Sequence, residues 1–157
     1  MKIKRHGSYL ETDHQGFVIP IASIERIQKD WFPITQDVIT FYKNKFKEYL
    51  HSVYIRGSVA KGDAIKNISD LDSFAILKQA VDKVDSPFSK EFQIEMNKKY
   101  PFCQHIEITY IDKESVFEKS PFRSRSIWEE LIKTQSACIY GEDLVHQIAP
   151  FLLKDMK

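Results

Sequence analysis

One stretch near the middle of the chain constrains the fold more than any other. A short run of β-branched and aromatic residues at positions 52–56 ends at Gly57, and a second apolar run covers positions 72–77. Runs of this length and composition, bounded by turn residues, predict buried β-strands. The acidic residues Asp70 and Asp72 stand where the turn between them ends and the second run begins. The stretch therefore predicts two strands joined by a connection that carries two carboxylates.

The two acids are separated by Leu71 alone. Residues two apart in an extended strand share a face, so both carboxylates are expected to project together while Leu71 enters the core. Like charges side by side are unfavourable unless a cation lies between them. Mg²⁺ (or Mn²⁺) takes hard oxygen ligands of this kind and usually keeps phosphate oxygens and waters as well. Asp70 and Asp72 are therefore predicted metal ligands.

The Gly57-Ser58 turn before the acids is a predicted phosphate contact. Glycine has no Cβ, so a ligand can approach its backbone closely. Backbone N–H groups at the start of a following helix favour an anion, and the Ser58 hydroxyl can donate one more hydrogen bond. Lys61 and Ser69 are further candidate contacts for the nucleotide.

A third carboxylate is expected on the next strand. Positions 103–111 alternate apolar and polar residues, which predicts a strand whose polar face carries His105 and Glu107. If this strand pairs beside the Asp72 strand, Glu107 joins the acidic pair. Three carboxylates can hold two metals and assist deprotonation of an attacking hydroxyl. Asp112 is the alternative for this third position.

The remaining pattern predicts an α/β (α+β) fold, with a small mixed twisted β-sheet flanked by helices. The length of 157 residues predicts a single domain, 1–157, with a catalytic core over about 52–144. A hairpin around Gly16 and helices before residue 50 precede this core. The expected helices cover residues 21–30, 34–50, 87–100 and 124–137, with a further short one after Gly141.

Bulk composition excludes some classes of protein. With 23 basic and 22 acidic residues, nothing predicts binding to nucleic acid or membrane through overall charge. The basic N-terminus has no apolar stretch behind it, and no apolar run approaches membrane-spanning length. The two cysteines have neither CxxC spacing nor a histidine pairing, which favours free thiols in a reducing compartment. We therefore expect a cytoplasmic protein.

These motifs together resemble the superfamily of nucleotidyltransferases that includes DNA polymerase beta, the aminoglycoside and lincosamide enzymes and the minimal nucleotidyltransferases of toxin–antitoxin pairs. The resemblance rests on Gly57-Ser58, Gly62 and Ser69-Asp70-Leu71-Asp72 with the apolar strand beyond. A weaker likeness continues to residues 139–144. Eleven residues separate Ser58 from Asp70, slightly more than the commonest pattern of the family. This leaves open whether Lys61, Lys66 or Arg56 contacts the phosphates.

The resemblance implies a Mg²⁺-dependent transfer of a nucleoside monophosphate, with ATP as the expected donor, onto an acceptor hydroxyl. It implies Asp70, Asp72 and Glu107 as catalytic residues and metal ligands, and Gly57 and Ser58 as triphosphate contacts. The acceptor is a small molecule, an RNA or a protein. Because few residues follow Gly141, we expect that a homodimer mate, another subunit or a cleft beside the sheet holds the acceptor, or that the chain is a fragment of something longer. The alternative is a nucleotide-binding regulatory or antitoxin-type module without turnover of its own.

Overall fold

A four-stranded mixed sheet forms the centre of the computed structural model, which describes residues 10–81 and 90–156. Strand β1 pairs antiparallel with β2 and β4, whereas β2 and β3 run parallel, so the order across the sheet is β3-β2-β1-β4. This mixed sheet, flanked by helices, confirms the predicted fold class. The strands are β1 (Leu50–Arg56), β2 (Leu71–Leu77), β3 (Ile106–Asp112) and β4 (Ser136–Gly141).

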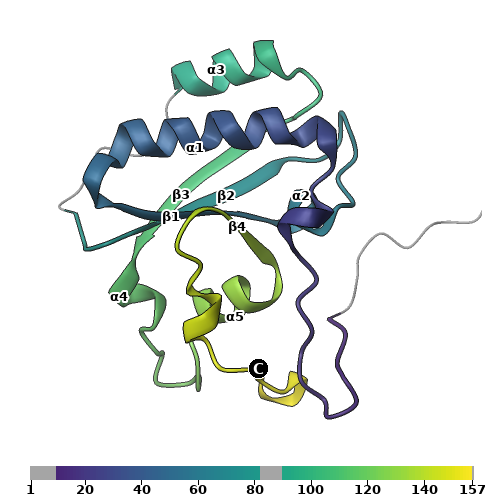
Figure 1. Ribbon diagram of the computed structural model, residues 1–157, viewed down its shortest axis with the longest axis vertical. Coiled ribbons are helices and arrows are strands. Elements are labelled where there is room, and N and C mark those ends of the chain that lie inside the picture. Colours follow the sequence, from purple (N-terminus) through teal and green to yellow (C-terminus); the bar gives the residue numbers. More distant parts are fainter. Residues whose placement is uncertain (1–9, 82–89, 157) are drawn as a thin grey trace, which may run out of the picture.

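Helices cover both faces of the sheet (Figure 1). Helices α1 (Phe32–Phe46) and α3 (Lys90–Lys99) lie on one side, and α4 (Lys113–Val116) and α5 (Ile127–Thr134) lie on the other. The one-turn helix α2 (Gly57–Lys61) follows β1 directly. Short 3₁₀ helices complete the chain: η1 (Ile24–Arg26), η2 (Lys29–Trp31), η3 (Lys47–Tyr49), η4 (Leu144–Gln147) and η5 (Leu153–Asp155).

The central strands are buried on both faces, as their apolar sequences predict. Val53 and Ile55 of β1 pack in the cluster under α1, whereas Tyr54 of the same strand packs in the cluster on the α5 side. Phe74 of β2 lies opposite Tyr54, and their rings stack with centroids 4.9 Å apart. Because alternate residues of a strand point to opposite faces, Arg56 and Asp72 share the α5 side with these rings.

Helix α1 is tied to the two strands that carry Asp72 and Glu107 through one buried tyrosine. The Tyr42 hydroxyl lies 3.0 Å from the Ser73 hydroxyl of β2, donates to the Thr109 carbonyl of β3 and accepts from the Thr109 N–H. Ser73 in turn donates to the Glu107 carbonyl. Burial raises the pKa of Tyr42, so the phenol stays protonated as a donor.

We expect Tyr42→Phe to lower the free energy of unfolding by about 1–3 kcal/mol, because it leaves buried polar partners without a hydrogen bond. Urea denaturation monitored by circular dichroism measures this. Tyr49→Phe is the matched control, since Tyr49 is 40% exposed, and should change stability by no more than about 0.5 kcal/mol. Equal effects of the two substitutions would show that the network contributes nothing.

The helix predicted over residues 21–30 is wrong. The chain there is extended at Ser23 and then forms the short 3₁₀ helices η1 and η2. Its backbone N–H groups bond to other elements instead of to a helix of their own: Ile21 donates to the Thr134 carbonyl and Ser23 to the Ala60 carbonyl. This segment therefore straps the end of α2 to α5, and tertiary contacts override its helical periodicity.

The sequence analysis also missed strand β4. Helix α5 ends at Thr134, three residues before the predicted end, and the chain then runs antiparallel to β1 as far as Gly141. Gly141 has a φ of +79°, and a Cβ there would lie 2.1 Å from the His51 carbonyl oxygen. Ser136 and Ala137 are weak strand formers, so the local sequence does not distinguish this edge strand from the end of a helix.

The other predicted elements hold with shifted boundaries. The helix predicted over residues 34–50 is α1, which ends at Phe46, and the turn at Gly16 is a minimal hairpin with one bridge between Thr12 and Val18. Helix α3 lies within the predicted range 87–100, whose first residues are outside the described part. Both cysteines are free thiols. Across the described residues, no helix is long and apolar enough to cross a membrane.

Candidate active site

The two halves of the predicted motif meet at the end of β1. Gly57 begins α2 with a φ of +71°, a conformation that favours glycine. A Cβ on Gly57 would lie 2.7 Å from Oδ2 of Asp72, so the carboxylate lies directly against the Gly57 backbone. Leu71 is fully buried, as the strand pattern predicts. The structure therefore brings Asp72 and the Gly57-Ser58 turn together.

A row of polar side chains crosses the sheet at this point. Strand register pairs Arg56 with Asp72, and Asp72 with Glu107. Residues paired directly across neighbouring strands lie about 5 Å apart at their Cα atoms and point to the same face. Ser136 of β4 pairs with Arg56 on its other side. The predicted pairing of the Glu107 strand beside the Asp72 strand is thus present.

The environment of Asp72 opposes its negative charge. Burial is the largest cause that raises the pKa of Asp72, and the charges of Glu107 and Asp70 raise it further. Arg56 and His105 act in the opposite direction. A half-buried carboxylate held beside two others has a raised pKa unless a cation compensates, and such perturbed groups are typical of functional sites.

The third carboxylate, Glu107, is already paired with an arginine. Glu107 accepts a hydrogen bond from Arg56, with Nη2 and Oε2 2.6 Å apart, and both side chains are about one-third exposed. Over residues 10–81 and 90–156, no three acidic, histidine or cysteine side chains are grouped so that they could hold a metal ion. Asp70 lies just before β2 and is exposed, and its charge raises the pKa of Asp72. Mg²⁺ needs only one or two carboxylates besides phosphate and water, so Asp70 with Asp72 stays the predicted ligand pair.

Asp112, the alternative third carboxylate, lies elsewhere. It pairs with Leu77 at the far end of β2, five residues along the strand from Asp72. Its side chain caps α4 by accepting from the Ser115 N–H and hydroxyl. These hydrogen bonds lower the pKa of Asp112. Of the two candidates, Glu107 is the one placed beside Asp72.

Ser69 positions the loop before the acids. Its hydroxyl accepts from the Ile65 N–H at 2.8 Å, and its own N–H donates to the Ile65 carbonyl. The loop is also joined to the segment before β3, because Asn67 donates to the Phe102 carbonyl. The long interval after Ser58 is therefore an ordered turn. A contact between Ser69 and nucleotide stays a prediction.

The three basic candidates for phosphate binding differ in their surroundings. Lys66 forms an ion pair with Asp30 at 2.7 Å, and its ammonium lies 5.2 Å from the centre of the Phe102 ring. Arg56 is paired with Glu107. Lys61, half-buried at the end of α2, has no ion pair within the described parts of the chain. Of the three candidates, Lys61 is thus the one whose charge no acidic partner occupies in the described residues.

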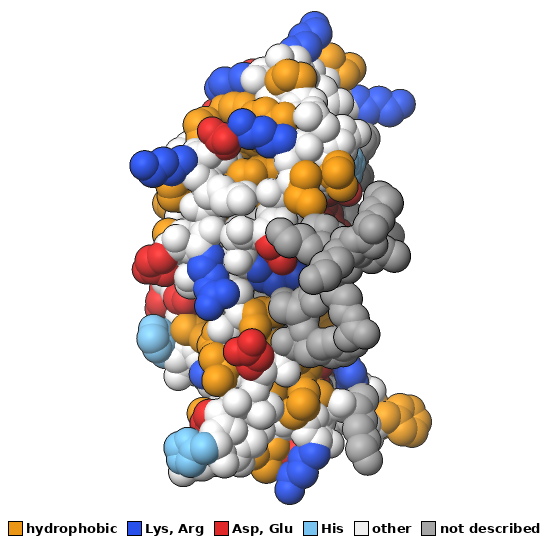
Figure 2. Space-filling view, turned by 90° about the vertical axis from the view of Figure 1, so that its right-hand side faces the viewer, with side chains coloured by type: hydrophobic (Ala, Val, Ile, Leu, Met, Phe, Trp, Pro, Cys, Tyr) orange, Lys and Arg blue, Asp and Glu red, His pale blue; other side chains and the backbone are white. Residues whose placement is uncertain are grey.

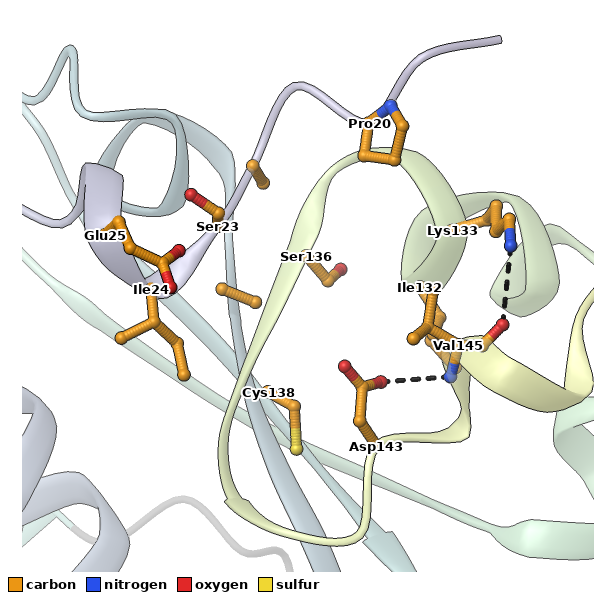
Figure 3. Close-up of a pocket in the computed structure, with 12 residues that line it drawn as sticks. Pro20, Ser23, Ile24, Glu25, Ile132, Lys133, Ser136, Cys138, Asp143 and Val145 are labelled. Carbon is orange, nitrogen blue, oxygen red and sulfur yellow. Dashed lines mark hydrogen bonds between the residues drawn. The ribbon is translucent and has the colours of Figure 1, made fainter. Parts of the chain in front are cut away.

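A pocket of about 290 Å³ lies beside the row on the β4 side (Figure 3). Ser136 lines it and is also the strand neighbour of Arg56. The opposite walls come from the strap before α1, from α5 and from the segment after β4, where the N–H of Val145 donates to Asp143. Its lining mixes hydroxyl, acidic and apolar groups, as in small-molecule sites.

The charge on the face viewed in Figure 2 is mixed in sign. Figure 2 shows acidic and basic side chains interspersed with hydrophobic ones on the face that it views. This agrees with the formal net charge of +1. The site is therefore distinguished by the local arrangement of Arg56, Asp72 and Glu107.

Comparison with known proteins finds similarity in solved structures. No family model and no curated protein matches the sequence. The chain is similar to spectinomycin adenyltransferase AAD(9) from Enterococcus faecialis, solved with ATP and spectinomycin, at 14% identity and a TM-score of 0.47. The match covers 77% of this chain and 60% of that one.

Two mutant structures of the toxin–antitoxin pair MntA-HpeT are also similar. One matches at 17% identity and a TM-score of 0.42, over 73% of this chain and 79% of that one. The other matches at 16% identity and a TM-score of 0.40, over 72% and 76%. At these identities and scores the likeness is to the fold alone.

Proposed function

We propose that this chain is a nucleotidyltransferase that moves a nucleoside monophosphate, with ATP as the expected donor, onto an acceptor hydroxyl. The observation that carries the proposal is the Asp72 carboxylate, half-buried against the Gly57 backbone and next to the charges of Asp70 and Glu107. A buried acid against an open backbone turn is an arrangement for holding a cation and a phosphate side by side.

Asp70 and Asp72 would hold Mg²⁺ or Mn²⁺. The bound ion would neutralise phosphate charge and orient the α-phosphate for attack. Asp72 lies on the central sheet. Its two neighbours along β2, Leu71 and Ser73, are both fully buried. The protein would therefore contribute a carboxylate anchored on the sheet, and such positioning accelerates phosphate chemistry.

Gly57, Ser58 and Lys61 would bind the triphosphate. The first N–H groups of α2 have no partner within the helix. Ser58 lies in this first turn, and Lys61 lies at its end with its ammonium unpaired in the described residues. These groups would supply hydrogen bonds and one positive charge to the bound triphosphate.

Labelled ATP tests the reaction class. We expect label from the α-phosphate to appear on an acceptor and label from the γ-phosphate to appear in pyrophosphate, when the protein is incubated with Mg²⁺ and fractions of small molecules, RNA or protein. Transfer of the γ-label instead would identify a kinase. Release of γ-label as inorganic phosphate alone would identify a hydrolase, and either result contradicts the proposal.

Lys61→Met should raise the KM for ATP roughly tenfold and change kcat less, because it removes a charge that binds ground state and transition state alike. Steady-state kinetics against ATP concentration measures the change. Lys66→Met is the matched control, since Lys66 already pairs with Asp30. A larger effect of Lys66→Met than of Lys61→Met would reassign the phosphate contact.

One observation favours the second candidate, a nucleotide-binding module without turnover. Glu107, the expected third carboxylate, is held by Arg56 in this structure. Calorimetry that shows binding of Mg²⁺-ATP, together with no label transfer to any acceptor fraction, would support the module. The neighbouring pocket gives a place for a small ligand, and a second copy or another subunit remains the proposed source of any larger acceptor site.

A further inference from the structure

The Arg56 side chain reaches from β1 to a partner on β3, two strands away. Arg56 leaves β1, and its direct neighbour in the row is Asp72 of β2. Its guanidinium nevertheless bonds to Glu107 of β3, one strand further, at 2.6 Å. Neighbouring strands lie about 4.8 Å apart, so the side chain must extend over Asp72 to reach this partner.

The guanidinium therefore occupies the Glu107 carboxylate, on the face of the sheet that also carries Asp72. Both carboxylates are on the same face of the sheet. Arg56 forms its ion pair with Glu107, and its positive charge also lowers the pKa of Asp72. Arginine is always charged and forms charge-assisted hydrogen bonds with carboxylates. A metal ion placed at Glu107 would have to displace this bond and would meet a like charge beside it.

We propose that Arg56 takes the place of a second metal ion, so that the chain binds one divalent ion with its nucleotide and Glu107 serves to position Arg56. This inference rests on the proposed function. Glu107 is then a positioning residue and not a metal ligand. Arg56 has five N–H donors, of which the Glu107 contact uses one, so it can also bind an oxygen of the transferred phosphate.

Counting bound Mn²⁺ in the presence of α,β-methylene-ATP tests the inference without any acceptor. Electron paramagnetic resonance of free Mn²⁺ should give one tight site per chain for the unaltered protein. Glu107→Gln should leave this count at one. Arg56→Lys, which keeps the charge, should also leave it at one, whereas Arg56→Met should release Glu107 and raise the count to two.

Two bound ions in the unaltered protein, reduced to one by Glu107→Gln, would overturn the inference and establish Glu107 as a ligand. A count of one for Arg56→Met, with thermal unfolding that shows a folded protein, would also overturn it. If Arg56→Met does not fold, the counts for the unaltered protein and Glu107→Gln decide.

Failure of the proposed function would give a different result from failure of this inference alone. Calorimetry with α,β-methylene-ATP is done on the same samples. No nucleotide binding and no nucleotide-dependent Mn²⁺ site would reject the proposed function and this inference together. Nucleotide binding with two ions would reject only the inference.

Discussion

Asp72→Asn is expected to lower nucleotidyl transfer by at least about 10³-fold, or about 4 kcal/mol in activation free energy. The amide keeps the shape of the carboxylate and removes the charge that binds the cation at the centre of the row. Asp72 is the acid that lies against Gly57 and pairs in register with both Arg56 and Glu107. Transfer of α-phosphate label measures the loss.

The same substitution should raise stability. The pKa of Asp72 is raised in the folded chain, chiefly by burial, so folding disfavours its charged form. The folded state then holds the proton more tightly than the unfolded state, and stability falls as pH rises above the ordinary value of 3.8. Asp72→Asn removes this penalty. Its melting temperature should exceed that of the unaltered protein at pH 7, and the difference should shrink as pH falls toward 3.8.

Asp37→Asn is the control for both effects. Asp37 lies on α1, on the other side of the sheet, and accepts hydrogen bonds from Lys99 and Tyr100. We expect this variant to transfer label normally and to be no more stable than the unaltered protein. An Asp72→Asn protein that is active, or that is less stable at pH 7, would contradict the assignment of Asp72 as a functional acid.

Gly57→Ala is expected to reduce kcat/KM by roughly 10²-fold. The new Cβ would lie 2.7 Å from Oδ2 of Asp72, which is closer than such atoms approach, so the carboxylate must move. A shift of about 1 Å in a catalytic group costs a factor of this size. Steady-state transfer assays measure it, and magnetic resonance of the methyl-labelled alanine reports whether the protein stays folded.

Gly16→Ala separates this effect from backbone strain. Gly16 has a similar positive φ of +87°, but a Cβ there meets only Leu152, at an ordinary distance of 3.7 Å. Both alanine variants should lose about 1–2 kcal/mol of stability from the left-handed conformation. Only Gly57→Ala should lose activity. Equal activity of the two variants would mean that the position of Asp72 does not depend on the missing Cβ of Gly57.

Local sequence predicted the parts of the site that are close in the chain. The strand ending at Gly57, the buried Leu71 between two acids and the face that carries Glu107 all follow from alternation and turn chemistry. The sequence placed Glu107 near Asp72 only if β3 pairs beside β2, and the structure shows this pairing. Parallel pairing of this kind depends on tertiary packing, which periodicity does not encode.

The ion pair between Arg56 and Glu107 could not be predicted, because 51 residues separate its members. One signal was available in retrospect. Arg56 and Tyr54 are two residues apart on β1 and so share a face. Arg56 is therefore on the same face as the acids with which its strand pairs. The strap at residues 21–30 and strand β4 were not predicted for a related reason. Their backbone hydrogen bonds go to α2, α5 and β1, and these tertiary contacts override the helical periodicity of residues 21–30.

Calorimetric titration with Mg²⁺ and α,β-methylene-ATP tests the central assignment most directly, since it needs no acceptor. The arrangement of Asp72 against Gly57 predicts saturable, Mg²⁺-dependent binding that weakens at least about tenfold in Asp72→Asn and is unchanged in Asp37→Asn. Absence of binding to the unaltered protein, or equal affinity of Asp72→Asn, would contradict a metal–nucleotide site at the end of β1.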